Sequence, residues 1–293
     1  MAAMDGEPPA VARQRVRRAL RKAREGTPMS QGDVAKKLGW SLSKMQRIEA
    51  GEVAVSPTDL RALLDLYGIT DPGDVARLAA DARRSRRQRW LTPPEHRTYL
   101  TAAHRQLLQF EAQATTIRAY QSILIPGVLQ TPAAAMTVLG WQDNSSITDE
   151  QRRVRYDVRM QLRRRVVEEG DGPEYFMILD EAVIKRRLGT VEVMAELLES
   201  VAEVAHRSNL HVRVLPFDQG AQTGLYTPFQ LLDLSDDPED VVAYRESIDS
   251  DEFIHDVAVI QKLRRVFDTL WEASLPEFET ERRILAEAAA LRN

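Results

Sequence analysis

The sequence predicts a mostly α-helical fold with a small mixed β-sheet, of the α+β class, in which an N-terminal five-helix bundle precedes a C-terminal α/β domain. Two observations support this prediction. Before residue 83, apolar residues recur every three or four positions between helix-capping residues and glycines. After residue 95, short β-prone segments alternate with longer helical ones, and no internal repeat is evident. The 293 residues are enough for two domains with separate cores.

The composition is typical of a globular protein without membrane spans. Hydrophobic residues make up 43% and charged residues 29%, and no apolar run approaches the ~20 residues that cross a bilayer. The first residues lack the apolar stretch of a signal peptide. Cysteine is absent, which excludes disulfides, thiol nucleophiles and cysteine-bound zinc. We therefore expect a cytoplasmic protein.

The net charge of −4 hides an asymmetry along the chain. Residues 1–90 hold 18 Lys and Arg against 11 Asp and Glu, which leaves 22 basic and 33 acidic residues for the remainder. DNA phosphates attract a basic part and repel an acidic one. This distribution is typical of a nucleic-acid-binding domain carried by a body that does not touch DNA.

Capping and spacing patterns place five helices in the first third of the chain. Residues 1–9 are expected to form a disordered tail, and residues 10–82 the helical domain. Small polar residues or proline begin the helices, and glycine ends several of them. The expected helices cover residues 11–25, 30–38, 41–50, 57–67 and 72–82.

The second and third of these helices form the most informative stretch. Ser30 can cap the first of the pair, Gly39 can end it in a left-handed conformation, and Ser41 can cap the second. Short polar side chains remain on the outer face of the second helix, as a helix inserted into the major groove of DNA requires. The apolar residues expected between the two helices are Val34, Ala35, Leu38, Met45 and Ile48.

The spacing resembles the helix-turn-helix of the Cro-like, or xenobiotic-response-element (XRE), repressor family. The resemblance implies a DNA-binding domain. The alternative is an ordinary helical hairpin with a solvated outer face, but such a hairpin needs neither Gln31 nor a short polar cluster. The matching positions are Gln31, Ala35, Gly39, Met45, Ile48 and the closing run 46–51.

Specific polar residues of this motif suit contacts to DNA. Gln31 can bind a phosphate through its amide, aided by the helix N-terminus. Gln pairs well with adenine and Lys with guanine acceptors, so residues 43, 44 and 46 are candidates for base edges. Arg47 can bond either Glu49 or a phosphate, and Ser41 is more favoured as a helix cap than as a base reader. The expected DNA-binding residues are Gln31, Ser41, Ser43, Lys44, Gln46 and Arg47.

A basic linker is expected at residues 83–95, before a second domain at 96–293. Its run 83–89 is a solvated helix surface in one interpretation and adds phosphate contacts in the other. The pair Pro93–Pro94 predicts a hinge there.

The second domain is predicted to mix helices with a small sheet. Expected helices cover about 96–114, 149–169, 191–207, 251–273 and 276–291, with a short helix after residue 131. Expected strands cover 116–120, 174–179, 211–215, 229–234 and 241–245.

Several blocks of this domain resemble an antitoxin-like domain common in actinobacterial regulators. They occur in the family's order over about residues 90–275. The resemblance implies a regulatory, dimerising or partner-binding domain, a short partner protein encoded nearby, and neither enzymatic activity nor a required cofactor. The matching blocks are 111–112, 125–131, 159–161, 179–183, 214–217 and 228–232.

Candidate reactive groups have simpler structural interpretations. Asp180 and Glu181 can hold Mg²⁺ as in nucleases, but Asp180 is favoured as the cap of a helix over 181–188. A metal shared by His206 and His211 is disfavoured, because His206 suits a helix C-terminus. We expect no catalytic residue, metal site or cofactor.

Three functions compete. The first is a transcriptional regulator that reads the major groove of a (pseudo)palindromic operator on double-stranded DNA as a homodimer. The second is an antitoxin-like protein that sequesters a small neighbour-encoded partner, with DNA binding for autoregulation. The third, a Mg²⁺-dependent nuclease, is the least favoured. A membrane partner is not expected.

Overall fold

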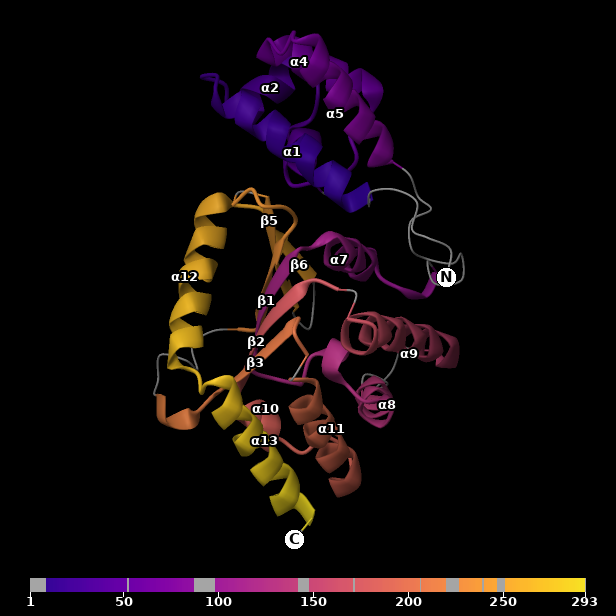
Figure 1. Cartoon of the computed structure of the whole chain (residues 1–293). Helices are drawn as coiled ribbons and strands as arrows, with labels where there is room; N and C mark the ends of the chain where they lie inside the picture. The colour runs from indigo at the N-terminus through magenta and orange to yellow at the C-terminus, as the bar shows by residue number, and fades with distance from the viewer. Residues whose placement is uncertain are drawn as a thin grey trace. The chain divides into compact units, whose positions relative to one another are not determined.

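The computed structural model describes residues 9–51, 53–86, 98–141, 148–170, 172–205, 207–219, 227–238, 240–246 and 251–292. These residues confirm the predicted α+β fold, with helices first and a mixed sheet in the second part (Figure 1). The chain divides into two compact units. Unit 1 comprises Met1–Thr92 with Leu108–Gln113, and unit 2 comprises Pro93–Leu107 with Ala114–Asn293. The described residues do not include residues 1–8 of the expected tail at 1–9, nor residues 87–95 of the expected linker at 83–95 with its Pro93–Pro94 hinge. Pro9, the last residue of the expected tail, is instead the first residue of helix α1.

Unit 1 contains the five helices predicted for the first third of the chain. Each of α2 to α5 begins after a side chain that accepts a backbone N–H, and α2 and α4 end at glycines with positive φ. The helices are α1 (Pro9–Glu25), α2 (Gln31–Leu38), α3 (Leu42–Glu49), α4 (Pro57–Tyr67) and α5 (Pro72–Arg84).

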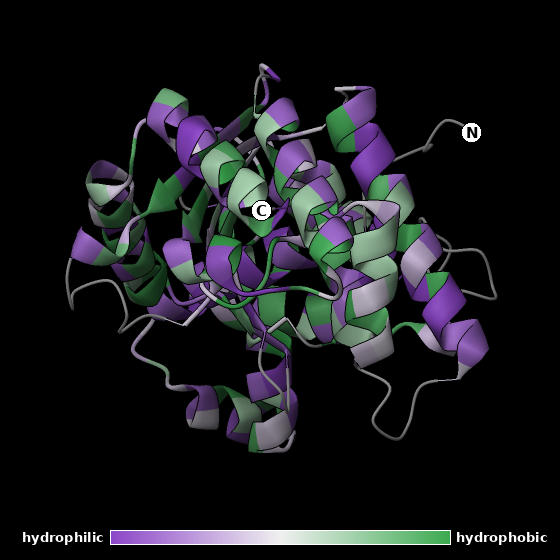
Figure 2. Cartoon of the chain, turned by 90° about the horizontal axis from the view of Figure 1, so that it is seen from below, coloured by the Kyte–Doolittle hydropathy of each residue, from purple (hydrophilic) through white to green (hydrophobic). Residues whose placement is uncertain are grey.

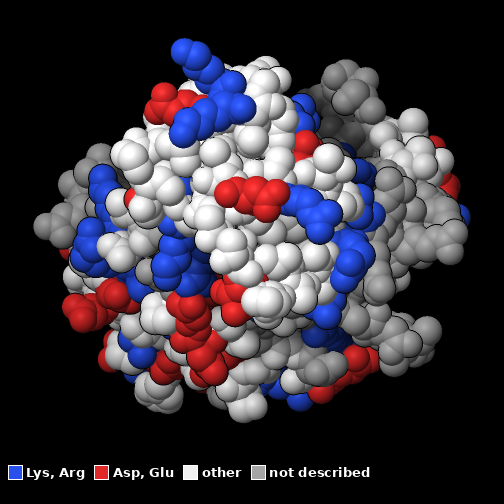
Figure 3. Space-filling model, turned by 90° about the horizontal axis from the view of Figure 1, so that it is seen from above, with Lys and Arg blue, Asp and Glu red and all other residues white. Residues whose placement is uncertain are grey.

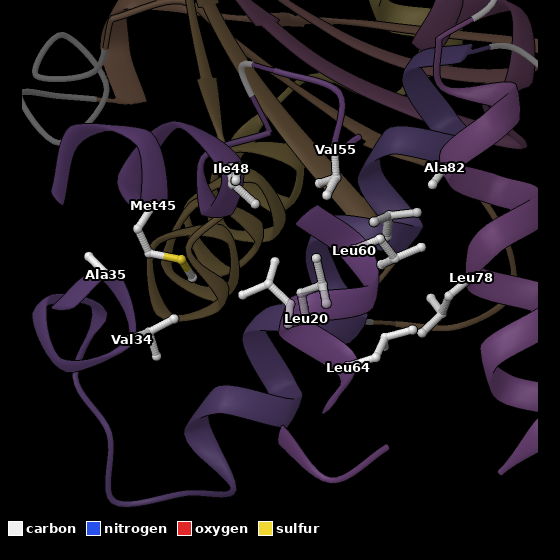
Figure 4. Close-up of a cluster of buried hydrophobic side chains, with 12 residues drawn as sticks. Leu20, Val34, Ala35, Met45, Ile48, Val55, Leu60, Leu64, Leu78 and Ala82 are labelled. Atoms are coloured by element: carbon white, nitrogen blue, oxygen red, sulfur yellow. The ribbon is translucent and has the colours of Figure 1, made fainter. Parts of the chain in front are cut away.

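A single apolar cluster holds these five helices together. Its side chains converge from all five helices, as the close-up in Figure 4 shows for most of its members. Met45 on α3 and Val34 on α2 are completely buried. Full burial of a side chain of this size contributes roughly 1.5–3 kcal/mol relative to exposure, so the contact fixes α3 against α2. The predicted packing of residues 34, 35, 45 and 48 is confirmed.

Unit 2 is built on a six-stranded sheet with the order β3-β2-β1-β4-β5-β6. The pairs β1–β2 and β2–β3 are parallel, and the pairs from β1–β4 outward are antiparallel. All five predicted strands are present. The strands are β1 (Thr116–Gln121), β2 (Glu174–Asp180), β3 (Leu210–Leu215), β4 (Phe229–Asp233), β5 (Val241–Glu246) and β6 (Asp251–Ile254).

Helices lie on both sides of this sheet. Figure 1 shows α12 along one face and α8, α9 and α11 on the opposite side, so both faces are covered and most residues of the strands are buried. Figure 2 shows hydrophilic and hydrophobic residues alternating along several helices, as amphipathic helices require. The helices are α7 (Ala102–Gln113), α8 (Pro132–Trp141), α9 (Asp149–Arg163), α10 (Glu181–Lys185), α11 (Val191–Val204), α12 (Val257–Ala273) and α13 (Glu277–Arg292). A π-helical turn, η2 (Arg164–Glu168), follows α9, and 3₁₀ turns occur at η1 (Gly127–Leu129) and η3 (Phe217–Gln219).

The prediction of one helix over 251–273 was wrong at its start. Residues 251–254 form strand β6 instead, and the helix begins only at Val257. Asp256 accepts the backbone N–H of Val259 at 3.1 Å and so caps α12. Upstream of that cap, Phe253 pairs with Tyr244 across the β5–β6 ladder, and their ring centroids lie 5.2 Å apart. The cross-strand aromatic pair therefore extends the sheet by one strand.

Among the described helices, none combines the length and apolar character needed to cross a membrane.

Candidate nucleic-acid interface

The turn between α2 and α3 has the geometry predicted from Gly39. Gly39 has φ 67° and lies in the left-handed region, where glycine is favoured. The backbone N–H of Trp40 donates to Ala35 O at 2.8 Å, and that of Gly39 donates to Lys36 O at 3.3 Å. These bonds satisfy carbonyls that the helix end would otherwise leave unpaired. The chain then reverses within three residues and begins α3.

Both helices of the motif carry the predicted N-caps. Ser30 and Asp33 form a capping box, in which the Ser30 hydroxyl accepts the N–H of Asp33 and the Asp33 carboxylate accepts the N–H of Ser30 at 2.9 Å. Hydrogen bonds from Ser30 lower the pKa of Asp33. Ser41 Oγ accepts the N–H of Lys44 at 3.1 Å. Ser41 is therefore the cap of α3, as favoured from the sequence.

The outer face of α3 is polar and exposed. Ser43, Gln46 and Arg47 are exposed, while Met45 and Ile48 on the opposite face are buried. A short helix with a buried apolar stripe and exposed polar side chains has the form that enters a major groove. Three of the expected base- and phosphate-contacting residues are thus accessible on one face.

Leu42 is a surface residue that the sequence interpretation did not include. It is the first residue of α3, and 48% of its surface is exposed. Apolar side chains at the start of a recognition helix can contact the methyl group of thymine. The signal was available in the sequence, because Leu42 follows the cap residue and falls outside the apolar stripe of α3.

Lys44 does not face outward as expected. Its Nζ lies 2.8 Å from Asp59 Oδ1 on α4 and 3.9 Å from the centre of the Trp40 ring. The side chain is 38% exposed. The ion pair and the cation–π contact direct the ammonium toward α4, because a carboxylate and a ring face are both within its reach. Trp40 itself packs against the core of unit 1.

Glu49, the last residue of α3, is the centre of a buried polar network. Its side chain is 3% exposed, and its carboxylate accepts hydrogen bonds from Arg24 Nε at 2.6 Å and from Arg24 Nη2 at 3.0 Å. Gln31 Nε2 donates to Glu49 Oε2 at 2.6 Å. The network therefore joins the end of α1, the start of α2 and the end of α3. Because an amide carries two N–H groups, Gln31 retains a second donor for a phosphate at the α2 N-terminus.

The network changes the acid–base properties of its members. Hydrogen bonding to Glu49 raises the pKa of Arg24 above its ordinary value. Burial raises the pKa of Tyr67 to about 12, and the Glu49 carboxylate acts in the same direction. The bidentate arginine fixes the carboxylate in one orientation, since both of its oxygens are engaged. We missed this network from the sequence because its members are 18 and 25 residues from Glu49.

On the face of the molecule seen in Figure 3, Lys and Arg side chains lie in separate groups, with acidic side chains between some of them. Two arginines of unit 1, Arg15 and Arg84, bind Asp81 at 3.0 and 3.1 Å. Pairing of this kind reduces the charge that unit 1 offers to a phosphate backbone.

Other candidate sites have structural roles. Asp180 Oδ1 accepts the N–H of Ala182 at 2.9 Å, which confirms it as the cap of α10, although that helix ends at Lys185. Glu181 binds the backbone N–H of Phe217 and Arg283 Nη1, each at 2.8 Å. No group of three or more potential metal ligands occurs within the described ranges. His206 lies outside these ranges, and His211 Nε2 is 3.3 Å from Glu174.

Comparison with known families agrees with this geometry. A helix-turn-helix domain family matches residues 15–78, so unit 1 carries a helix-turn-helix DNA-binding domain, and the protein is of the class of DNA-binding regulators. A second match, to the domain of unknown function DUF5753, covers residues 104–286. This match spans more than half of the chain, and the protein belongs to the DUF5753 family. The comparisons with curated proteins and with solved structures found no match.

Proposed function

We propose that the protein is a sequence-specific transcriptional regulator of the Cro-like (XRE) type that reads a (pseudo)palindromic operator as a homodimer. The observation that carries the proposal is the exposed face of α3, where Ser43, Gln46 and Arg47 project opposite a completely buried Met45. Side chains of these types hydrogen-bond to base edges or to phosphates. Leu42 adds an apolar contact at the start of the same helix.

Residues around α3 are proposed to position this helix on the DNA. Gln31 at the N-terminus of α2 is proposed to bind a phosphate, held in place by Glu49. Lys44 is proposed to act by exchanging Asp59 for a phosphate or base acceptor when DNA is bound, since an ion pair between partly exposed groups is weak. Ser41 contributes through the cap that orients the first turn of α3.

The dimer is proposed because one domain of this size contacts one half-site. Specificity at genome scale generally requires more contacts than a half-site offers. Two-fold symmetry places two recognition helices about 34 Å apart, in successive major grooves. We place the protein in the cytoplasm, on the nucleoid when bound to DNA.

Selection of bound sites from random duplexes tests the proposal. A palindrome with half-sites about one helical turn apart is the expected result. Recovery of unrelated sequences after several rounds, with no enrichment over the starting pool, would contradict sequence-specific binding. Enrichment of a single, non-repeated site would contradict only the proposed homodimer and not the sequence-specific binding.

A second proposed function is supported by the acidic character of the rest of the chain. Residues 91–293 hold 22 basic and 33 acidic residues, which suits a basic partner. In this proposal, the antitoxin-like DUF5753 region sequesters a small neighbour-encoded protein, and DNA binding serves autoregulation. Copurification of such a protein with the full chain, in the absence of DNA, is the expected result. In neither proposal is the protein an enzyme. The two carboxylates considered for a nuclease, Asp180 and Glu181, are engaged in a helix cap and in ion pairing.

A further inference from the structure

Arg159 on α9 is a half-buried cation without an ion-pair partner in the described part of the chain. Burial lowers its pKa, because the charged form has lost part of its hydration. Among the described residues its one hydrogen bond runs from Nη1 to Gln130 Oε1, at 3.2 Å. A guanidinium carries five N–H groups, so most of its donors remain available to another partner.

The segment around the 3₁₀ turn η1 holds this guanidinium in place. Gln130 is 3% exposed, and its Nε2 donates to Ile125 O at 2.8 Å, so its Oε1 is fixed toward Arg159. A Cβ on Gly127 would lie 3.2 Å from Arg159 Nε and 3.3 Å from its Cδ. Glycine therefore leaves the space that the arginine side chain needs. A binding group whose supporting residues fix its orientation is preorganised for a ligand.

The titratable groups near Arg159 compensate its charge only in part. Arg155, one turn earlier on α9, adds a second positive charge. Glu246 attracts Arg159 from beyond ion-pair distance, and burial raises the pKa of that carboxyl. Asp251 is engaged by a tyrosine hydroxyl at 3.0 Å. Burial lowers the pKa of His104 to about 4, and both arginines act in the same direction, so this imidazole is neutral near pH 7.

We propose that Arg159 binds the carboxylate group of a small organic acid. With Nη1 bonded to Gln130, the edge formed by Nε and Nη2 is left for a ligand, and two parallel N–H groups match the two oxygens of a carboxylate. The neutral His104 can donate to or accept from a second polar group of the same molecule. These residues belong to unit 2, so the proposal adds a ligand site to the proposed regulator and does not depend on DNA binding.

Thermal unfolding of the full-length protein with increasing succinate, without DNA and at an ionic strength held constant with chloride, tests the proposal. A saturable rise of the unfolding midpoint is expected, because a ligand of the folded chain stabilises it. Arg159→Gln should weaken binding about tenfold or more, and Arg159→Lys nearly as much, since an ammonium lacks the planar fork. The matched control is Arg153→Gln on the same helix, whose side chain is 72% exposed. Its half-saturating concentration should change by less than about twofold.

Gly127→Ala tests the geometry while it keeps every charge. The added methyl would lie against the Arg159 side chain and shift the guanidinium by a few tenths of an ångström. Binding of succinate should therefore weaken about threefold or more, because a carboxylate fork tolerates little displacement. Circular dichroism verifies that each variant is folded. If Arg159→Gln melts early, Arg159→Lys and Gly127→Ala carry the test.

Each contrary outcome overturns the proposal. The absence of a saturable rise beyond the effect of chloride does so directly. Equal weakening in Arg153→Gln would show only general attraction of anions to α9, and an equal response to inorganic phosphate would show that no planar carboxylate site exists. Binding that is unchanged in both Arg159→Lys and Gly127→Ala would place the succinate elsewhere on the protein.

Discussion

At the residue scale, one buried carboxylate positions the residues that are proposed to bind DNA. Glu49 accepts three hydrogen bonds, two from Arg24 and one from Gln31, at 2.6–3.0 Å. A buried charge of this kind is tolerated only when its partners remain in place. The recognition helix and the proposed phosphate-binding amide are therefore fixed by the same group.

Replacing Glu49 with Ala should destabilise unit 1 by about 3–5 kcal/mol, because Arg24, 14% exposed, loses both of its hydrogen bonds to this carboxylate. Chemical denaturation followed by circular dichroism measures this loss. Asp74→Ala is the control, since that carboxylate is 51% exposed and pairs with Arg77 at 2.6 Å on the surface of α5. Its expected effect is below about 1 kcal/mol. A similar loss of unfolding free energy in both variants would show that the network around Glu49 stabilises unit 1 no more than a surface ion pair does.

Leu42 should make the protein sensitive to a single methyl group in its operator. Replacing thymine with uracil at the contacted position removes one methyl, worth about 0.8 kcal/mol or roughly fourfold in affinity. In Leu42→Ala the preference for thymine should disappear, whereas Ser43→Ala should retain it. Binding titrations of each protein variant, with the thymine and the uracil form of the selected operator, complete a double-mutant cycle that measures this preference. An unchanged preference in Leu42→Ala would assign the methyl contact to another residue.

Gln46→Ala should relax base preference more than Arg84→Ala does. Gln46 is exposed on the outer face of α3, whereas Arg84 pairs with Asp81 near the end of α5. A lost base contact changes discrimination by about 1–3 kcal/mol, while a lost phosphate contact weakens all sequences alike. Affinities for the operator and for single-base variants separate the two effects. Equal changes in discrimination would mean that base and phosphate contacts have been assigned wrongly.

At the element scale, the turn between α2 and α3 was predictable because its signals are local. Ser30, Gly39 and Ser41 each act on backbone within four residues, so their types alone indicate where the helices begin and end. Lys44 was not predictable in the same way, because Asp59 and the face of Trp40 reach it from elements whose packing is not encoded locally.

Gly39→Ala should destabilise unit 1 by about 1 kcal/mol. No atom lies within 4 Å of the position a Cβ would occupy, so the left-handed backbone is the source of the strain. Gly140→Ala is a control of opposite sign, because Gly140 lies in helix α8 with equally open space, and alanine is favoured over glycine in a helix by up to about 1 kcal/mol. Denaturant midpoints of the two variants should move in opposite directions. A stabilised Gly39→Ala would contradict the positive φ.

At the scale of the whole molecule, the sequence predicted the α+β class and five strands but not the strand order. Register between β1 and β2 depends on residues 58 positions apart, such as Thr116 and Glu174, whose pairing no local pattern specifies. Strand β6 was missed for a related reason, since its four residues become a strand only by pairing with β5. The charge asymmetry, in contrast, is a property of composition and was available at once.

Because of that charge asymmetry, we expect the salt concentration to have a strong effect on the affinity of the proposed regulator for DNA. A dimer with roughly six to ten phosphate contacts should lose about 10³-fold or more in affinity between ~50 and ~200 mM salt, because condensed counterions are released on binding. Fluorescence anisotropy with the selected operator at graded salt concentrations measures the slope. A non-specific duplex of equal length should show a similar slope at much weaker affinity, since phosphates supply the salt dependence and bases supply the difference. A flat response on the operator would mean that few phosphates are contacted, and it would exclude a basic helix-turn-helix surface as the source of binding.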